Sequence, residues 1–298
     1  MEQNTAKPGI NWYPGHMTKA KRAMLEDIKL IDLVIEIVDA RIPVSSRNPD
    51  IDQMAAGKAR LIILNKADLA DEARNAEWVG YFTEKGAHVL KTDSRNKANM
   101  KAVSAVIADA CKEKKERDRR RGIINRPVRA MVAGIPNVGK STFINSFAGR
   151  SCAKTGNKPG VTKGKQWIRL NKDVELLDTP GILWPKLDDA AVGTHLAFIG
   201  SINDNIIDMT ELAGELALFL SQKYPQALAK RYGEINARDK ESVLEGIAKS
   251  RGCLMKGGEL DYNKAAAVLM EDFRSGKLGR ITIESADEYE DKGEKVCD

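Results

Sequence analysis

A short run of glycines, a lysine and a serine near the middle of the chain has the spacing of a phosphate-binding loop. Gly134-Ile135-Pro136-Asn137-Val138-Gly139-Lys140-Ser141 fits the pattern G-x-x-x-x-G-K-[ST]. Glycines let the backbone turn its N–H groups inward around phosphate oxygens, and the helix that follows adds its positive N-terminal end. We expect Lys140 to reach the β- and γ-phosphates and the Ser141 hydroxyl to ligate Mg²⁺. The pattern therefore predicts a nucleoside triphosphate site.

A second motif indicates which base that nucleotide carries. Asn65-Lys66-Ala67-Asp68 follows an apolar run and fits N-K-x-D. Guanine presents its N1–H and N2 amino donors side by side, and the Asp68 carboxylate can accept from both, whereas adenine offers no such pair. We expect Asn65 to fix the loop and the Lys66 stem to lie over the ring. Asp93-Ser94 follows a later apolar run, and its position predicts a backbone N–H contact to guanine O6.

Two segments after the phosphate loop have residues expected to respond to the terminal phosphate. Thr162, at the end of Lys158-Pro159-Gly160-Val161-Thr162, is the expected switch I residue, which ligates Mg²⁺ and senses the γ-phosphate. In Asp178-Thr179-Pro180-Gly181, we expect Asp178 to hold Mg²⁺ through water and the Gly181 N–H to face the γ-phosphate. The expected contacts to GTP or GDP are Asn65, Lys66, Asp68, Asp93, Ser94, Asn137, Val138, Gly139, Lys140, Ser141, Thr142 and Gly181.

These loops need a sheet that brings them to one edge. Largely apolar, β-branched runs predict strands near residues 32–39, 60–64, 87–90, 127–133, 166–170 and 174–178. This pattern predicts an α/β fold, a Ras-like P-loop GTPase domain with a six-stranded, mostly parallel sheet that binds ligands beyond the carboxyl ends of its strands. The guanine motif precedes the phosphate loop, the reverse of the Ras-like order, so we expect a circularly permuted domain. From about Asn205 the pattern becomes wholly helical and predicts a small all-α domain.

Composition narrows the class of protein. The chain has 298 residues, 42% hydrophobic and 30% charged, which indicates a soluble globular protein, and its net charge is +6. Positive charge favours an anionic partner such as RNA, and a solvated basic surface is the alternative. The basic run from Lys112 to Arg121 has the same two interpretations, an RNA-phosphate contact or a solvated helix end. The four cysteines are widely separated, which argues against a zinc site or disulfides and suits a reducing cytoplasm. We see no signal-peptide or membrane-spanning run.

The motif order and three longer segments resemble one known family. The segments are Trp12-Tyr13-Pro14-Gly15-His16-Met17, Pro159-Gly160-Val161-Thr162 and Asp178-Thr179-Pro180-Gly181-Ile182-Leu183-Trp184-Pro185. Over about residues 10–280 the chain closely resembles the ribosome biogenesis GTPase A family of bacterial, circularly permuted GTPases. The resemblance implies a cytoplasmic GTPase that binds the immature large ribosomal subunit and its rRNA, promotes late maturation and is released after hydrolysis. It also implies that the ribosomal particle stimulates hydrolysis and that the protein is monomeric off the ribosome.

The same resemblance organises the rest of the chain. We expect a circularly permuted GTPase domain at 1–200, an all-helical RNA-binding domain at 201–283 and an acidic, disordered tail at 284–298. Basic residues of the helical domain are candidates for rRNA phosphate contacts: Lys230, Arg231, Lys249, Arg251, Lys256, Lys264, Arg274, Lys277 and Arg280. Two alternatives stay open, a GTP-regulated RNA-binding scaffold and a permuted GTPase with a non-ribosomal target.

The resemblance also implies a catalytic residue and a second metal ion. Ras-like enzymes orient the attacking water with a glutamine after the switch II glycine, but Ile182 stands there and cannot form a hydrogen bond through its side chain. The resemblance assigns the role to His16, because an imidazole can orient water, and the alternative is a structural helix cap. Asn137 occupies a position where related GTPases use asparagine to hold K⁺ against the phosphates; otherwise it only tightens the loop. Mg²⁺ and K⁺ are the expected cofactors.

Overall fold

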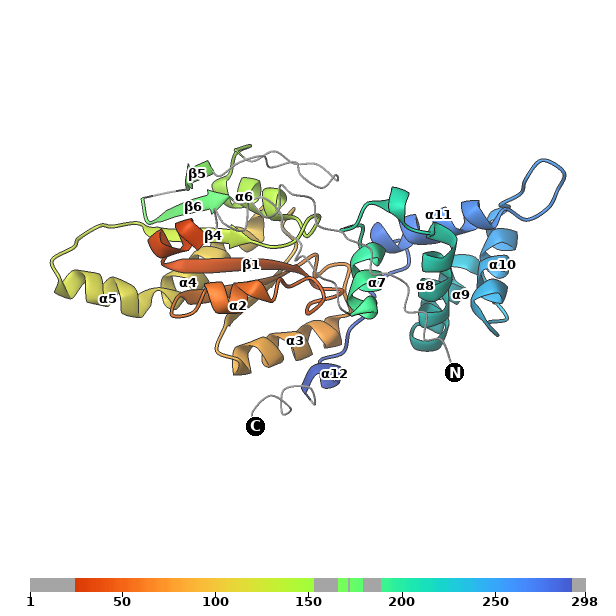
Figure 1. Cartoon of the computed structure of the whole chain (residues 1–298), viewed down its shortest axis with the longest axis horizontal. Coiled ribbons are helices and arrows are strands. Elements are labelled where there is room, and N and C mark those ends of the chain that lie inside the picture. Colours follow the sequence, from red (N-terminus) through yellow and green to blue (C-terminus); the bar gives the residue numbers. More distant parts are fainter. Residues whose placement is uncertain (1–24, 153–165, 171, 179–188, 291–298) are drawn as a thin grey trace, which may run out of the picture.

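Runs of aliphatic and β-branched residues form one mostly parallel sheet (Figure 1). The computed structural model describes residues 25–152, 166–170, 172–178 and 189–290. Within these ranges the strands are β1 (Leu33–Asp39), β2 (Ala59–Asn65), β3 (His88–Thr92), β4 (Val128–Ala133), β5 (Gln166–Arg169) and β6 (Val174–Asp178). Their order is β3-β2-β1-β4-β6-β5, and only β5 and β6 pair in antiparallel fashion. The predicted six-stranded sheet is confirmed.

The sheet brings the two predicted nucleotide motifs to the same edge. β1 lies at its centre and pairs in parallel with β2, which ends in the guanine motif, and with β4, which leads into the phosphate loop. The carboxyl ends of parallel strands meet at one edge, so both loops leave the sheet there. The segment that comes late in a Ras-like domain comes first in this chain. Its strands β1, β2 and β3 nevertheless pair into the same sheet as β4, β5 and β6, with β1 beside β4. This arrangement confirms the predicted circular permutation.

Helices cover the sheet on both faces. They are α2 (Asp50–Met54), α3 (Glu72–Glu84), α4 (Met100–Ala110), α5 (Lys112–Arg120) and α6 (Lys140–Ala148). Alternate residues of a strand face opposite sides, and β2 shows this: Ile62 packs in one buried cluster with Trp78 of α3, while Ile63 belongs to the cluster that contains Val103 of α4 and Phe143 of α6. The strands therefore read as continuous apolar runs because both faces are buried.

The second half of the chain continues into helices that lie beyond one end of the sheet (Figure 1). They are α7 (Ala190–Phe198), a 3₁₀ turn (Asp204–Ile206), α8 (Met209–Lys223), α9 (Pro225–Tyr232), α10 (Lys240–Arg251) and α11 (Tyr262–Arg274). Aspartates cap four of these helices, because the carboxylates of Asp189, Asp208, Asp239 and Asp261 accept first-turn backbone N–H groups. The predicted helical C-terminal region is confirmed. No helix within the described ranges is long and apolar enough to cross a membrane.

The end of the described chain runs back from the helices to the sheet. We call residues 278–290, which include α12 (Asp287–Glu290), the C-terminal strap. Its Ile283 N–H donates to the Arg41 carbonyl at 2.8 Å, and Trp78 Nε1 of α3 donates to the Glu284 carbonyl at 3.3 Å. The rings of Trp78 and Tyr289 lie 5.8 Å apart. The strap therefore connects the helical region to the loops at the carboxyl edge of the sheet.

Glu284 anchors the strap through its side chain. The carboxylate is buried and accepts the backbone N–H groups of Val44 and Ser45 at 2.7 and 3.0 Å. It also lies 3.1 Å from Nδ1 of His195 in α7. The expectation that an acidic, disordered tail begins at residue 284 is therefore wrong for residues 284–290. Acidic composition suggested solvation, but burial of Ala286 and of the Glu284 carboxylate holds this stretch against the sheet domain. Residues 291–298 lie outside the described residues.

Candidate functional site

The phosphate loop has a backbone that only small residues allow at two positions. Gly134, Asn137 and Gly139 all have positive φ angles, of 154°, 63° and 97°. A Cβ atom at Gly134 would overlap the Ile37 carbonyl, and one at Gly139 would overlap the Asn65 amide. Gly139 precedes α6 and, having no side chain, does not cap that helix with a side-chain hydrogen bond.

The Lys140 side chain is held against the phosphate loop by backbone carbonyl groups of that loop. Its Nζ donates to the carbonyls of Gly134 at 3.0 Å and Ile135 at 2.9 Å, and the residue is buried. Two backbone carbonyls of the phosphate loop thus hold the ammonium group on that loop. Ser141 and Thr142 follow in the first turn of α6 and are half-buried. The predicted roles of Lys140 and Ser141 toward the phosphates and Mg²⁺ stay predictions.

Asn65 joins three loops that are distant in sequence. Its Nδ2 donates to the Val138 carbonyl of the phosphate loop at 2.6 Å. Its Oδ1 accepts from the backbone N–H of Ser94 at 3.0 Å and from the Ser94 hydroxyl at 2.7 Å. Asn65 itself is buried, so these bonds are protected from water. The structure thus brings together the phosphate loop, the guanine motif and the Asp93-Ser94 loop.

Lys66 is fixed by a buried pair of charges that the sequence analysis missed. Its Nζ donates to Asp39 Oδ2 at 2.9 Å and to the Asn137 carbonyl at 2.8 Å. Asp39, fully buried at the end of β1, also binds Arg41, whose Nη2 lies 2.8 Å from Oδ2. Burial opposes ionisation, but Arg41 and Lys66 bring the pKa of Asp39 well below its ordinary value. Asp39 ends the buried strand beside the guanine strand, and Arg41 follows it, so their position in the sequence could have indicated that both lie near the guanine motif.

Asp68 has one carboxylate oxygen available for a ligand. Its Oδ2 accepts from Arg95 Nη2 at 2.6 Å, while its Oδ1 is buried and has no hydrogen-bond partner in the described part of the chain. An unpaired buried oxygen is costly, and this is the group expected to accept from guanine. Arg95 also binds the Asp93 side chain at 2.9 Å and so holds the two acidic loops together. This orphaned oxygen is the strongest sign of a ligand at the guanine motif.

The structure places some of the remaining predicted residues and leaves others open. Asp178 ends β6, and its backbone is in register with Val132 of β4, so it reaches the same sheet edge as the phosphate loop. Asn137 has an additional contact, because its Nδ2 donates to the Gly200 carbonyl after α7. Three predicted residues lie outside the described residues: His16, Thr162 and Gly181.

Comparisons with known proteins agree with this geometry. A family model described as 50S ribosome-binding GTPase matches residues 129–244. Ribosome biogenesis GTPase A of Bacillus cereus is 46% identical over 291 residues, which are 97% of each chain. The solved GDP-bound structure of TM YlqF has a TM-score of 0.65 at 26% identity and covers 89% of this chain and 100% of its own. GNP-bound YlqF from T. maritima has a TM-score of 0.62 at 28% identity, covering 90% and 99%. The similarity therefore extends through both the sheet and the helices.

Proposed function

The chain belongs to the ribosome biogenesis GTPase A family, and on that premise we propose that it acts as a GTP-driven assembly factor for the large ribosomal subunit. It is a GTPase. In the proposed cycle it binds the immature subunit with GTP, promotes late maturation and leaves after hydrolysis. A cytoplasmic location and a monomeric state off the particle belong to the same proposal. The observation that carries it is the joining of three nucleotide loops by Asn65, beside the Asp68 Oδ1, which has no hydrogen-bond partner within the described ranges.

Each loop has a part in the proposed chemistry. Asp68 accepts from guanine, Lys66 is held in place by Asp39, and Lys140 neutralises charge at the β- and γ-phosphates. Ser141 at the start of α6 and Asp178 at the end of the neighbouring strand fit a Mg²⁺ site, to which Thr162 would add a ligand. Mg²⁺ bound there would stabilise the negative charge on the β- and γ-phosphate oxygens. Asn137 is the residue proposed to help hold K⁺.

We assign the orientation of the attacking water to His16. A histidine that only caps a helix would affect stability, whereas a water-orienting histidine affects turnover. His16→Ala should leave GTP binding and particle docking intact and lower particle-stimulated hydrolysis by roughly two or more orders of magnitude. His88→Ala is the matched control, because His88 lies at the start of β3 and pairs only weakly with Asp109, at 3.6 Å. Full stimulated turnover in the His16 variant would return His16 to a structural role.

The partners of the nine basic candidates in the helical domain divide them into two groups. Six are paired with carboxylates: Arg231, Lys249, Arg251, Arg274, Lys277 and Arg280. The other three, Lys230, Lys256 and Lys264, are exposed and make no ion pair with the rest of the described chain. Lys256 follows two exposed apolar residues, Leu254 and Met255, in the loop after α10. A lysine without an ion pair can bind a phosphate without first breaking a salt bridge. These three lysines are therefore our proposed rRNA contacts.

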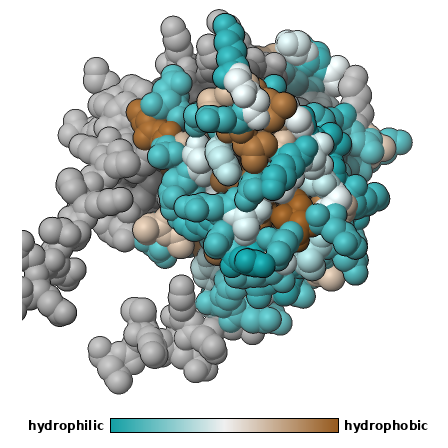
Figure 2. Space-filling view, turned by 90° about the vertical axis from the view of Figure 1, so that its right-hand side faces the viewer, coloured by the Kyte–Doolittle hydropathy of each residue, from teal (hydrophilic) through white to brown (hydrophobic). Residues whose placement is uncertain are grey.

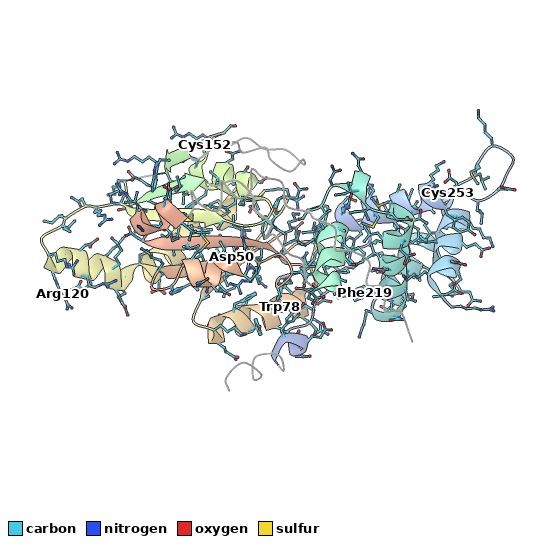
Figure 3. All side chains as sticks on the ribbon, viewed as in Figure 1. Asp50, Trp78, Arg120, Cys152, Phe219 and Cys253 are labelled. Atoms are coloured by element: carbon cyan, nitrogen blue, oxygen red, sulfur yellow. The ribbon has the colours of Figure 1, made fainter. Side chains whose placement is uncertain are left out.

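This proposed RNA surface lies at the end of the molecule remote from the sheet. Figure 2 views that end and shows a largely hydrophilic face with separate hydrophobic patches. A second basic surface lies at the opposite end, where Figure 3 places Arg120 of α5 far from Phe219 and Cys253 of the helical domain. In α5, Lys114 is paired with Asp118, and Arg120 with Glu116. RNA contact and a solvated helix remain the two interpretations of α5.

Sedimentation with ribosomal fractions tests the proposed function. The full chain should travel with large-subunit precursors in the presence of a non-hydrolysable GTP analogue and be released with GDP. The double variant Lys256→Glu/Lys264→Glu should lose this association, while the control Lys29→Glu/Lys101→Glu carries the same charge change on exposed residues of the sheet domain and should keep it. Association that is indifferent to the nucleotide, with no stimulation of turnover, would support the scaffold alternative. Absence of association with any ribosomal particle would support a non-ribosomal target.

A further inference from the structure

The outer side of the phosphate loop is held by the turn that leads into the helical domain. Ser201 Oγ donates to the Pro136 carbonyl at 2.7 Å, and Asn137 Nδ2 donates to the Gly200 carbonyl. Ser201 is only 1% exposed, so its bond to the loop is shielded from water. Two consecutive residues of the phosphate loop are thus tied to two consecutive residues of this turn.

Arg274, the last residue of α11, holds that turn in place. Its Nε donates to the Phe198 carbonyl at 3.0 Å and its Nη2 to the Ala197 carbonyl at 2.7 Å, both at the C-terminal end of α7. The same guanidinium binds both carboxylate oxygens of Asp204, at 2.7 and 2.8 Å. The last carbonyl groups of a helix have no N–H donor within the helix, so a cation at this end can bind them. The planar guanidinium of arginine has enough N–H donors to bind these carbonyls and a carboxylate at the same time.

Gly200 lies directly against this guanidinium. Its φ is +73°, and a Cβ built there would lie 3.4 Å from Arg274 Cζ. Four of the five N–H donors of an arginine are engaged in these bonds, so Arg274 is a poor candidate for the rRNA contact that its charge suggested. The arginine faces inward, toward the nucleotide loops, rather than outward to a partner.

A cavity of about 610 Å³ lies at the same junction. Lys66 and Asn137, from the two nucleotide motifs, line one side of it, and Asn203, Glu271 and Arg274 line the other. The helical domain therefore forms part of the surroundings of the phosphate loop itself. Contact between the two is direct, through named hydrogen bonds, and does not depend on the switch segments.

We propose that Arg274 and Ser201 are positioning residues for guanine nucleotide binding, through which the helical domain holds the phosphate loop in its binding shape. Arg274 fixes the end of α7 and Gly200, and the Gly200-Ser201 turn fixes the carbonyl of Pro136 and the side chain of Asn137. This inference rests on the nucleotide site of the proposed function but not on its ribosomal target. By thermodynamic linkage, any partner that shifts the helical domain also changes the affinity for the nucleotide, by the same factor in both directions.

Release of a fluorescent GDP analogue from the free full-length chain tests the proposal. Arg274→Ala and Ser201→Ala should each accelerate release about threefold to tenfold, which corresponds to one lost hydrogen bond in the chain of contacts. Because both residues act through one turn, the double variant should release GDP no more than about twice as fast as the faster single variant. A release rate in the double variant that is accelerated by the product of the two single factors would overturn the proposal. Unchanged release in Ser201→Ala, the variant least able to disturb folding, would also overturn it.

Two further measurements separate positioning from a general loss of structure. Arg280→Ala is the matched control, since Arg280 also links the helical region to the sheet domain, through Glu72 at 3.4 Å, but does not contact α7. It should leave GDP release unchanged. In steady-state hydrolysis without ribosomes, Arg274→Ala should raise KM for GTP by the factor seen in GDP release and change kcat less than twofold. A fall in kcat at unchanged KM, or equal effects in Arg280→Ala, would overturn the proposal. Because no ribosomal particle is present, failure of ribosome docking leaves this test intact.

Discussion

Replacement of Asp68 by asparagine tests the guanine site most directly. The Asp68 Oδ1 is buried and has no donor among the described residues, and Oδ2 is held by Arg95 at 2.6 Å. The carboxylate is expected to accept two hydrogen bonds from guanine, and a bond to a charged group contributes about 1.5–3 kcal/mol. Loss of both therefore costs about 3–6 kcal/mol, or about 10²- to 10⁴-fold in GDP affinity. The change replaces an acceptor by an amide whose NH₂ group opposes the guanine donors.

Calorimetric titration with two nucleotides gives this prediction a sharp outcome. Xanthine has a carbonyl where guanine has its N2 amino group, so the new amide can donate to it. Asp68→Asn should bind xanthosine diphosphate more tightly than GDP, and the native chain should show the opposite preference. Glu77→Gln is the control, because Glu77 is an exposed carboxylate with its own arginine partner, Arg74, at 2.7 Å. Unchanged preference for GDP in the Asp68 variant would refute the assignment of this carboxylate to the base.

Three further predictions concern the phosphates, the monovalent ion and the strap. Lys140→Ala and Ser141→Ala should both abolish measurable hydrolysis and lower GTP affinity at unchanged circular dichroism, and normal turnover in either would contradict the phosphate-loop assignment. If K⁺ binds beside Asn137, hydrolysis should be faster in KCl than in NaCl at equal ionic strength; equal rates would count against the ion. Glu284→Ala leaves the buried Ser45 N–H and the partly buried Val44 N–H without their acceptor and should lower the free energy of unfolding in urea by about 2–6 kcal/mol, whereas exposed Glu288→Ala should change it little.

The sheet and its loops could be predicted because their signals are local. A parallel strand buried on both faces needs a largely apolar run, and β1, β2 and β4 each have one, with the buried Glu36 as the single charged residue between the apolar positions of β1. The phosphate loop depends on positive φ angles at Gly134 and Gly139, so glycine at those positions is itself the signal. Asn65 was expected to fix the guanine loop, and the structure extends this role to the Val138 carbonyl. Short-range rules were therefore sufficient for the motifs and the strands that carry them.

Charged residues whose partners lie far along the chain could not be predicted. Arg274 was one of nine basic candidates for RNA contacts, yet its partners are the end of α7 and Asp204, 70 residues away. Glu284 was assigned to a solvated tail because acidic residues surround it, yet two backbone N–H groups near Val44 bind its carboxylate. A sequence shows the charge of a residue but not which unpaired groups the fold will place beside it. Burial of a charge is stable only when such groups are present.

The permuted order has a physical consequence for switching. The helical domain follows the switch II segment directly and then returns through the C-terminal strap, so it meets the nucleotide site twice. The Gly200-Ser201 turn binds the phosphate loop, and Ile283 binds the carbonyl of Arg41, the residue that pairs with Asp39 beside Lys66. Rotation of the helices would have to break buried hydrogen bonds at both places at once, and such packed contacts respond in discrete steps rather than gradually. We therefore expect nucleotide exchange to select between two defined placements of the helical domain. Small-angle scattering with GDP and with a GTP analogue should then show either no change or a distinct second envelope, and a continuous spread of shapes would refute this reasoning.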